Sequence, residues 1–411
     1  MSIGETAMAR CAAWRHPPFS ETPQGLTRRY LTPAHRAALD QLAGWMRAAG
    51  MSVRLDAAGT LIGRYEGTGS KTVLIGSHID TVGDAGAYDG ALGVMLGLGC
   101  IEALAASGER LPFAIELLAF GDEEGSRFHA SMLGSRALAG TLPAILPEMV
   151  DTEGVSLAEA LHGFGLDVAR LPEAARARED VLLYLEPHIE QGPVLEAEKL
   201  PVGIVTGIAA QTRLKITVRG VANHAGTTPM NLRRDALVAT AEAMLALERI
   251  ATVAGIVGTV GTIEAHPGLS NVVPGRAVFS VDLRAPTEEA RDTAEQDFAR
   301  TLDEIAARRG VVVEMQVVQR LAPCFCDARA QALLAEAMAA QSVRPFYLPS
   351  GSGHDAMSVA ALCKVAMLFI RCRAGISHNP AEHVEAADAE TAAQVMLGFL
   401  RRLGEKEAAA F

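Results

Sequence analysis

The sequence predicts an α/β protein with two domains, in which one open sheet carries the chemistry and a smaller α+β domain is inserted. The first observation is the stretch 73–93, where a run of Val, Leu and Ile ends in Gly76-Ser77-His78-Ile79-Asp80. Open α/β sheets place functional groups at the carboxyl ends of buried strands. The second observation is the length of 411 residues, which is too long for one ordinary core. The third is a change to alternating apolar and polar residues over 212–219.

The first half of the chain predicts helices and buried strands in turn. We expect a helix over 33–49, because Thr32 can cap it, Pro33 suits the first helical position and Gly50 suits its end. No element is assigned to residues 1–32, and residues 130–180 are expected to be mostly helical. Three strands, a buried Ala/Leu/Gly-rich helix and a further core strand are expected, in this order, at 52–56, 60–65, 72–77, 91–107 and 112–120.

Three of these strands end in residues that bind metals. Asp89 follows the strand that ends at His78, Glu123 and Glu124 follow the strand 112–120, and His188 lies at the end of a strand over 181–189. Each group alone also fits a capping residue, an acidic turn or a structural histidine. Because three strands deliver imidazole or carboxylate groups at their ends, we interpret them together as a divalent metal site.

The second domain has the element order β-α-β-β-α-β, which predicts a ferredoxin-like fold. Its elements are expected at 212–219, 230–250, 256–264, 272–283, 287–308 and 310–318. After this domain, helices and buried strands again follow one another as in the first half of the chain, with a helix over 328–340, a strand over 364–370 and a helix over 386–402. We therefore expect a catalytic domain in two segments, 1–210 and 326–411, with the inserted domain at 211–325. An antiparallel sheet of this kind has an edge that can pair with a second copy.

Composition and charge exclude several classes of function. The formal net charge of −11 argues against a general nucleic-acid or anionic-membrane binder. No apolar run approaches membrane-spanning length. The six cysteines form no CxxC motif, and the first residues do not read as a signal peptide, so we expect a cytoplasmic protein.

With these motifs assembled, the chain resembles the dinuclear-zinc aminoacylase and carboxypeptidase superfamily, and more narrowly its hydantoinase/carbamoylase branch. That branch contains N-carbamoyl-L-amino-acid hydrolases, β-ureidopropionases and allantoate amidohydrolases. The resemblance implies a zinc-exopeptidase-like catalytic domain with a mixed sheet flanked by helices, and an inserted ferredoxin-like dimerisation or lid domain. The matching segments follow the family's order: Gly76-Ser77-His78-Ile79-Asp80-Thr81, Tyr88-Asp89-Gly90, Glu123-Glu124-Gly125-Ser126-Arg127-Phe128, His188-Ile189-Glu190-Gln191-Gly192, Asn223-His224-Ala225-Gly226-Thr227-Thr228-Pro229-Met230, Ser270-Asn271-Val272-Val273-Pro274-Gly275, Gly353-His354-Asp355-Ala356 and Ser377-His378-Asn379-Pro380.

The resemblance implies a site for two divalent metal ions, with Asp89 as the shared ligand. Zinc is the expected metal, and manganese, cobalt and nickel also suit imidazole and carboxylate ligands. His383 competes with His378 for the last ligand position, and the family pattern favours His378, with Glu382 ordering the loop. Asp80 is expected to hold the imidazole of His78. The full ligand set implied is His78, Asp89, Glu124, His188 and His378.

The resemblance also implies roles in catalysis and substrate binding. Glu123 would be the general base that takes a proton from water. His224 would stabilise the oxyanion at the partner chain's site in a homodimer, although a loop histidine beside a turn is the alternative. For Arg284 the alternative to carboxylate binding is a salt bridge with Asp282. The expected substrate-binding residues are Gln191, Gln211, Asn271, Arg284, Gly353 and His354.

The predicted function is the metal-dependent hydrolysis of the ureido C–N bond of a small carboxylic acid, with release of ammonia. Allantoate, N-carbamoyl-L-amino acids and β-ureidopropionate stay open as substrates. Two other hypotheses are an N-acyl-amino-acid deacylase or aminopeptidase (or dipeptidase) on the same scaffold, and a non-catalytic binding protein. A structural role is expected for the remaining histidines, His16, His35, His129, His162 and His266.

Overall fold

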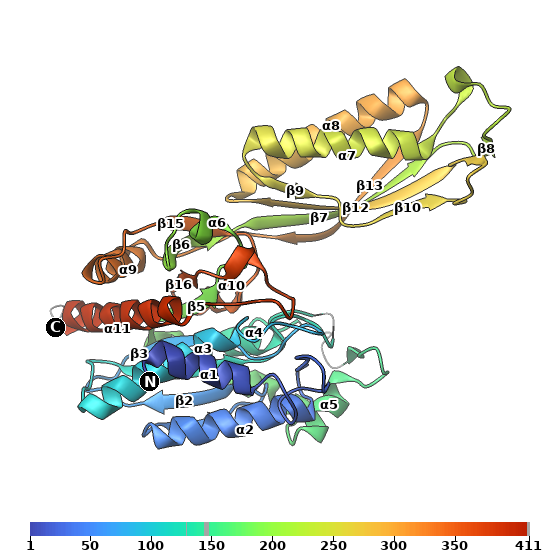
Figure 1. The fold of residues 1–411 in the computed structure, drawn as a ribbon. Coiled ribbons are helices and arrows are strands. Elements are labelled where there is room, and N and C mark those ends of the chain that lie inside the picture. Colours follow the sequence, from blue (N-terminus) through green and yellow to red (C-terminus); the bar gives the residue numbers. More distant parts are fainter. Residues whose placement is uncertain (129, 144–147, 409–411) are drawn as a thin grey trace. The chain divides into compact units, whose positions relative to one another are not determined.

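The computed structural model describes residues 1–128, 130–143 and 148–408, so His129 lies outside the described residues. The chain forms two compact units (Figure 1). Unit 1 consists of Met1–Thr206 and Phe325–Phe411, and unit 2 consists of Gly207–Cys324. Unit 2 is thus continuous in sequence and interrupts unit 1. No helix in the described part of the chain is both long and apolar enough to cross a membrane.

Unit 1 is built on a nine-stranded mixed sheet, as the predicted α/β class requires. Its order is β1-β2-β4-β3-β5-β16-β6-β14, with β15 paired to β6. The central strands β4, β3, β5 and β16 are parallel, so their carboxyl ends share one edge. The strands are β1 (Ser52–Leu55), β2 (Leu61–Tyr65), β3 (Thr72–His78), β4 (Ala114–Phe120), β5 (Val181–Ile189), β6 (Val202–Ile208), β14 (Cys324–Phe325), β15 (Tyr347–Ser350) and β16 (Val365–Ile370).

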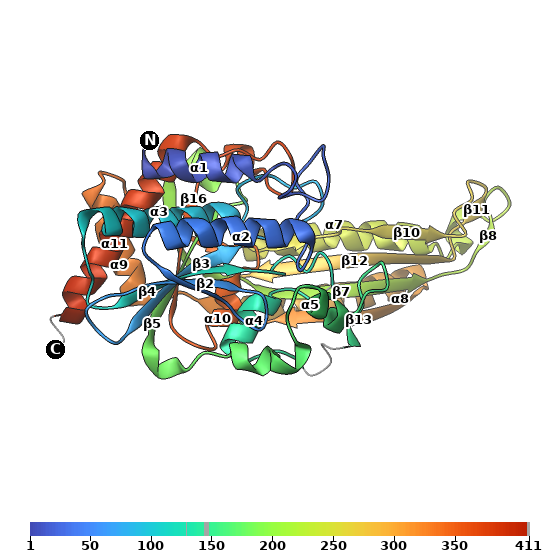
Figure 2. The same ribbon diagram turned by 90° about the horizontal axis from the view of Figure 1, so that it is seen from below.

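Helices cover both faces of this sheet (Figure 2). On one face α3 packs on β3, β4 and β5, and α1 and α11 pack on α3; α4 and α10 lie on the other face. Burial on both faces is usual for parallel strands. The helices are α1 (Ile3–Ala13), α2 (Pro33–Ala48), α3 (Ala91–Ser107), α4 (Leu133–Ala139), α5 (Leu157–Gly163), α6 (Val194–Ala197), α9 (Ala328–Ala340), α10 (Asp355–Val359) and α11 (Ala386–Ala408).

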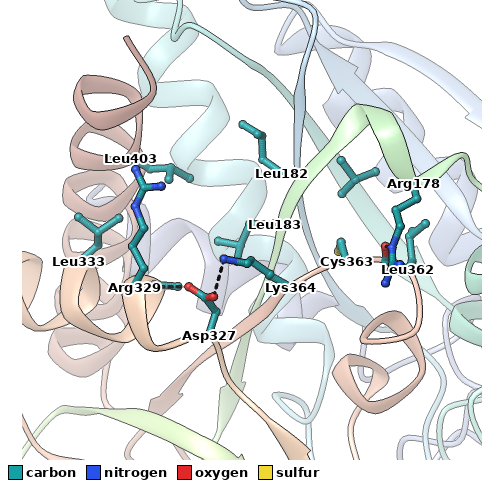
Figure 3. Close-up of a pocket in the computed structure, with 12 residues that line it drawn as sticks. Arg178, Leu182, Leu183, Asp327, Arg329, Leu333, Leu362, Cys363, Lys364 and Leu403 are labelled. Carbon is teal, nitrogen blue, oxygen red and sulfur yellow. Dashed lines mark hydrogen bonds and ion pairs between the residues drawn. The ribbon is translucent and has the colours of Figure 1, made fainter. Parts of the chain in front are cut away.

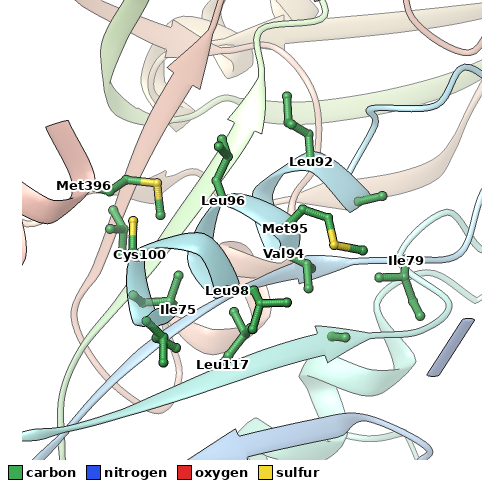
Figure 4. Close-up of a cluster of buried hydrophobic side chains, with 14 of the residues drawn as sticks. Ile75, Ile79, Leu92, Val94, Met95, Leu96, Leu98, Cys100, Leu117 and Met396 are labelled. Atoms are coloured by element: carbon green, nitrogen blue, oxygen red, sulfur yellow. The ribbon is translucent and has the colours of Figure 1, made fainter. Parts of the chain in front are cut away.

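The core of unit 1 is centred on α3, which is apolar all round because it is covered by the sheet on one side and by helices on the other. Figure 4 shows its side chains against Ile75 of β3, Leu117 of β4 and Met396 of α11. Gly93 brings α3 close to the sheet, since a Cβ atom there would lie 1.9 Å from the carbonyl oxygen of Pro187. The start of α3 is therefore held beside the end of β5.

Unit 2 has an antiparallel sheet of order β10-β12-β7-β13, with β9 paired to β12 and a separate β8–β11 pair. Its two helices contact the sheet, and Phe279, Phe298 and Leu302 lie in their shared core. The element order is β-α-β-β-α-β. The elements are β7 (Ala210–Arg219), β8 (Asn223–His224), α7 (Ala236–Ala254), β9 (Val257–Thr259), β10 (Ile263–His266), β11 (Val272–Val273), β12 (Arg276–Ala285), α8 (Glu288–Arg309) and β13 (Val312–Leu321).

Several elements differ from those expected. Helix α1 was not expected; its capping box joins Ser2 and Glu5. Strand β6 was also missed. Helix α7 begins at Ala236 rather than 230, because the Asp235 side chain caps it. The expected strand 256–264 is the pair β9 and β10, and 272–283 is β11 and β12. Among the described residues of 130–180, α4, α5 and short 3₁₀ helices (168–174 and 178–180) alternate with loops, so the expected helices are present but are short and separated.

Candidate metal centre and active site

The carboxyl edge of the parallel strands gathers the predicted metal ligands of unit 1. His78 is the last residue of β3 and is in register with Phe120, the last residue of β4. Glu123 and Glu124 therefore follow β4 beside His78, and His188 lies near the end of the next strand, β5. Residues far apart in sequence meet here because their strands are parallel neighbours.

Three overlapping groups of ligand atoms lie at this edge, each within 4.8 Å. Asp89 belongs to two of them, and its two oxygens face different histidines. Oδ1 lies 3.2 Å from Nε2 of His188, and Oδ2 lies 3.1 Å from Nε2 of His378. Glu124 Oε1 lies 3.3 Å from the same nitrogen of His378. The groups are His78, Asp89 and His188; His78, Glu123 and Glu124; and Asp89, Glu124 and His378.

The orientation of two imidazoles fits a cation. Nδ1 of His78 lies 3.0 Å from the carbonyl oxygen of Asp80, and Nδ1 of His188 lies 2.8 Å from that of Ile189. A carbonyl only accepts hydrogen bonds, so both Nδ1 atoms donate and both Nε2 atoms are turned toward the cluster. These two Nε2 atoms lie 3.4 Å apart. Nitrogens fixed in this way by backbone carbonyls are typical metal ligands.

The side chains of Asp89, His188 and His378 can bind either protons or a metal cation. Burial would raise the pKa of Asp89, but hydrogen bonds from His188 and His378 outweigh it and hold the pKa well below its usual range. Burial lowers the pKa of His188, but Asp89 outweighs it and raises this pKa to about 9. Hydrogen bonds to Asp89 and Glu124 raise the pKa of His378 to about 10. Binding of a cation would therefore release protons.

Glu123 is a buried carboxyl among other carboxyls. One of its oxygens lies 4.0 Å from Nε2 of His78. Burial first, and then the negative charges of Glu124 and Asp355, raise the pKa of Glu123 well above its usual value. A carboxyl with this environment retains a proton readily, which suits proton transfer.

Asp80 fixes the turn that carries the two glutamates. Its Oδ1 accepts the backbone N–H of Glu123 at 3.2 Å, and its Oδ2 accepts that of Glu124 at 3.3 Å. We expected this side chain to hold His78. In the structure the backbone carbonyl of Asp80 does so, while the carboxylate lies 3.8 Å from Nδ1 of His78.

The loop around His378 is tied to the start of α3. Glu382 Oε1 accepts the backbone N–H of Tyr88 at 2.7 Å and of Asp89 at 3.1 Å. Ser377 Oγ lies 3.0 Å from Oδ2 of Asp89. His383 lies outside the three ligand groups, with its Nε2 3.4 Å from Oε1 of Glu385.

Three residues expected to bind substrate lie in unit 1 near the centre. Gln191 donates to both oxygens of Asp89, at 3.2 and 3.1 Å. His354 is 1 % exposed and packs edge-on against His188 with ring centroids 4.5 Å apart, so it supports that ligand from behind rather than lining an open wall. Gly353 precedes it, and a Cβ atom there would lie 2.9 Å from Cε of Met132.

Two buried carboxyls were missed. Glu186 accepts from the Ser77 hydroxyl at 3.3 Å and from the Ala356 N–H at 2.7 Å, which links three segments around the centre. Asp355 is fully buried, and burial raises its pKa to about 8. Glu186 could have been found from its spacing, two residues before His188. Alternate residues of a strand share one face, so this spacing places both side chains on the same face of β5.

The predicted residues of unit 2 form two pairs rather than one group. Gln211 and Arg284 are cross-strand partners, and both donate to Asp282, at 2.8 and 3.0 Å. The alternative salt bridge of Arg284 is thus present. His224 and Asn271 lie beyond the other end of β7, on β8 and next to β11, where Nδ1 of His224 accepts the N–H of Gly226 at 3.1 Å. Strand geometry puts about 25 Å between the two pairs.

A family model also matches most of the chain. Residues 74–402 match the family described as peptidase family M20/M25/M40. The chain belongs to this family. The resemblance drawn from the motifs is therefore confirmed, and an α/β fold with a mixed sheet agrees with it. The match includes all residues of the three ligand groups.

Several relatives that cover nearly the whole chain are named as amidohydrolases, deiminases or amidases. The chain is similar to an N-carbamoyl-L-amino acid amidohydrolase of Geobacillus stearothermophilus, with 44% identity over 93% of this chain and 94% of the relative. It is 40% identical to a probable allantoate deiminase of Oryza sativa subsp. japonica, over 94% of this chain and 86% of the relative. The crystal structure of a hydantoinase/carbamoylase family amidase from Burkholderia multivorans has a TM-score of 0.90 at 31% identity, with 97% of each chain covered.

Proposed function

We propose that the protein is a metal-dependent amidohydrolase that cleaves the ureido C–N bond of a small carboxylic acid and releases ammonia. The observation that carries the proposal is the pair of ligand groups that share Asp89, with the buried carboxyl of Glu123, whose pKa is raised by burial, beside them. N-carbamoyl-L-amino acids and allantoate are the leading substrates, because relatives that cover nearly the whole chain are named for them. Those names favour ureido compounds over acylated amino acids and peptides.

Two divalent metal ions complete the proposed site. His78, Asp89 and His188 would hold one ion, and Asp89, Glu124 and His378 would hold the other. Zinc suits these nitrogen and oxygen ligands best, and manganese, cobalt or nickel can replace it. When bound, such a pair polarises the scissile carbonyl and acidifies water.

Glu123 moves the protons of the reaction. Its carboxylate takes a proton from the attacking water and delivers it to the leaving ureido nitrogen, which departs as ammonia. The carbamate that remains loses carbon dioxide. Asp80 keeps Glu123 and Glu124 on one turn, so that one carboxylate can bind metal while its neighbour transfers protons.

The remaining predicted residues are proposed to bind the substrate. Arg284 binds its carboxylate through the planar guanidinium, and Gln211 and Gln191 supply amide contacts. His224 and Asn271 stabilise the opposite end. A single copy of unit 2 cannot bring Arg284 and His224 to one small substrate, because β7 and β12 separate them by about 25 Å. This separation supports a homodimer in which His224 reaches the partner's site.

The proposed compartment is the cytoplasm. All six cysteines are free thiols in the structure, and Cys11, Cys100, Cys324, Cys326 and Cys372 are buried. Free buried thiols suit a reducing compartment.

The test is ammonia release by the purified protein after metal removal and after restoration of zinc or manganese. The substrates are allantoate, N-carbamoyl-L-amino acids and β-ureidopropionate, with N-acetyl-amino acids and dipeptides in parallel. We expect metal-dependent ammonia release from at least one ureido acid and little turnover of the acylated panel. Turnover of acylated amino acids or dipeptides alone would overturn the proposal in favour of a deacylase or peptidase.

A further inference from the structure

A fully buried arginine of the amino-terminal segment lies beside the end of β3. Arg28 belongs to residues 26–31, which form no helix and none of the named strands and which precede α2. Burial lowers its pKa to about 10, so the guanidinium stays charged at neutral pH. A buried charge is costly unless hydrogen bonds satisfy it, and for Arg28 backbone carbonyls accept those bonds.

The guanidinium binds the peptide between two residues of the metal centre. Nε of Arg28 donates to the carbonyl oxygen of Ile79 at 2.6 Å, and Ile79 lies between His78 and Asp80. The other side of this residue is also held, because the Ile79 N–H donates to the carbonyl oxygen of Phe120 at 3.0 Å. The end of β3 is thus fixed by β4 on one side and by Arg28 on the other.

The backbone of the same segment binds the loop that follows β3. The N–H of Arg28 donates to Oγ1 of Thr81 at 2.9 Å, and the Thr81 N–H donates to the carbonyl oxygen of Arg28 at 3.0 Å. Further along, the Ala85 N–H donates to the carbonyl oxygen of Leu26 at 2.8 Å. The loop that leads from β3 to Asp89 is therefore joined to this segment at two points.

The guanidinium is itself anchored by the chain that precedes it. Nη1 of Arg28 donates to the carbonyl oxygens of Phe19 at 3.1 Å and of Trp14 at 3.3 Å. Its Cζ atom lies 5.0 Å from the centroid of the Trp14 ring. Because charged hydrogen bonds and an aromatic ring both hold the side chain, Arg28 forms a fixed support for the Ile79 carbonyl.

The position of Ile79 affects the centre because one neighbour is a predicted ligand and the other orients ligands. The carbonyl oxygen of Asp80 fixes the imidazole of His78, and the carboxylate of Asp80 accepts the N–H groups of Glu123 and Glu124. A shift of the Ile79 peptide would therefore move His78 and the turn that carries Glu124.

We propose that Arg28 is a positioning residue of the metal centre, which holds His78 and the turn of Glu123 and Glu124 in place through the Ile79 carbonyl. This role rests on the proposed function, because it requires metal ions bound by His78 and Glu124. An effect on stability alone would leave the ligand geometry of the folded protein unchanged. A positioning role would change that geometry when Arg28 is replaced.

The experiment is titration of the metal-free full chain with Co²⁺, whose visible absorption bands report the geometry of its ligands. The wild type should bind two ions per chain. Arg28→Met removes the hydrogen-bond donors and keeps the apolar stem, so it should weaken cobalt binding at least tenfold and shift the bands at saturation. Arg28→Lys keeps the charge and one donor, so its affinity and bands should lie between those of Arg28→Met and the wild type.

Urea unfolding of each metal-free protein checks that it is folded at the temperature of the titration. Arg28→Met decides the proposal if it folds, and otherwise Arg28→Lys decides it by the same two measures. Wild-type affinity and bands in the deciding variant would overturn the positioning role. Weaker binding with unchanged bands would also overturn it, because a loss of stability alone explains that result.

The matched control is Arg178→Met in the same unit. Nε of Arg178 also donates to a backbone carbonyl, that of Leu362, at 2.9 Å (Figure 3). These two residues line a pocket beside the first residues of β5, whereas the ligand His188 lies near the end of that strand. Arg178→Met should bind cobalt as the wild type does, with the same bands. Equal changes in Arg178→Met and Arg28→Met would overturn the specific role of Arg28. A wild type that binds no cobalt would contradict the proposed metal centre itself, on which this role rests.

Discussion

At the scale of single residues, Asp89 decides the character of the centre. Its two oxygens face different histidines at 3.2 and 3.1 Å, so one carboxylate belongs to two of the three ligand groups. Replacement of Asp89 would therefore affect both metal positions, whereas replacement of His188 or His378 would affect one. Glu123 differs from these residues because it can be changed without removing a ligand of the proposed metal pair.

We expect Glu123→Gln to lower kcat by about 100-fold or more, because an amide cannot take and return the proton. Metal content should stay at two ions per chain, as the proposed ligands are intact. Steady-state ammonia release and metal analysis of the same preparation check both expectations. Unchanged turnover in Glu123→Gln would remove this residue from the mechanism.

His35 gives a pH dependence of stability that is independent of the metal centre. Burial, followed by repulsion from Arg28 and Arg36, lowers its pKa from 6.5 to about 3. The unfolded chain thus binds a proton below pH 6.5 that the folded chain excludes until about pH 3. Stability contributed by neutral His35 is complete above pH 6.5 and is lost as the pH falls toward 3.

The test compares wild type with His35→Gln, whose amide oxygen can still accept the Leu31 N–H. In chelator, the free energy of unfolding of the wild type should fall more steeply with decreasing pH, by up to about 1.4 kcal/mol per pH unit. Urea unfolding at intervals between pH 4 and 6 measures the difference. Parallel curves for the two proteins would contradict a neutral buried His35.

At the scale of elements, the close contact between α3 and β5 depends on a glycine, Gly93, which has no side chain. A Cβ atom at Gly93 would lie 1.9 Å from the Pro187 carbonyl oxygen, and Pro187 precedes the ligand His188. We expect Gly93→Ala to lower the free energy of unfolding by about 2–3 kcal/mol, since backbone on both sides must move. Urea unfolding checks this, and metal affinity should fall with stability.

Gly44→Ala in α2 is the matched control. Nothing lies within 4 Å of a Cβ atom at this position. An added methyl group there should raise the free energy of unfolding by about 0.5–1 kcal/mol, because alanine favours the helix. If Gly93→Ala were as harmless as Gly44→Ala, the close approach of α3 to β5 would be wrong.

The sequence predicted the central elements of unit 1 well because their composition is distinctive. The strand ending at His78 lies where its apolar run indicated, and the helix 91–107 lies where the Ala/Leu/Gly-rich stretch indicated. Strand β6 was missed because its apolar run follows the short helix α6 without a change in pattern. The carboxyls of Glu186 and Asp355 were missed for another reason. Their burial arises from the packing of β5, α4 and α10, which local sequence does not encode.

At the scale of the whole molecule, the homodimer makes a prediction about mixed subunits. His224→Ala and Arg284→Ala should each abolish most activity. In a heterodimer of the two variants, one site would receive an intact Arg284 from one chain and an intact His224 from the other. Co-expression in equal amounts should then restore about a quarter of the wild-type activity.

The control for complementation is a mixture of Arg284→Ala and Gln211→Ala. These residues are cross-strand partners at the same end of unit 2, so one copy supplies both to a site. No site in that heterodimer is complete, and activity should not exceed the mean of the two variants. Absence of rescue in the His224 and Arg284 mixture would show that subunits do not share sites.

The interrupted course of unit 1 also sets an order for folding during synthesis. Unit 2 is contiguous, and its strands from β7 to β13 pair only with one another, so it can fold as soon as it leaves the ribosome. Strand β16, by contrast, lies between β5 and β6, and β6 cannot join the sheet until this late segment arrives. His378 follows β16 in the chain. The nascent chain therefore carries a folded unit 2 while the ligand groups of unit 1 are still incomplete. The metal centre is completed in one of the last steps of synthesis and folding.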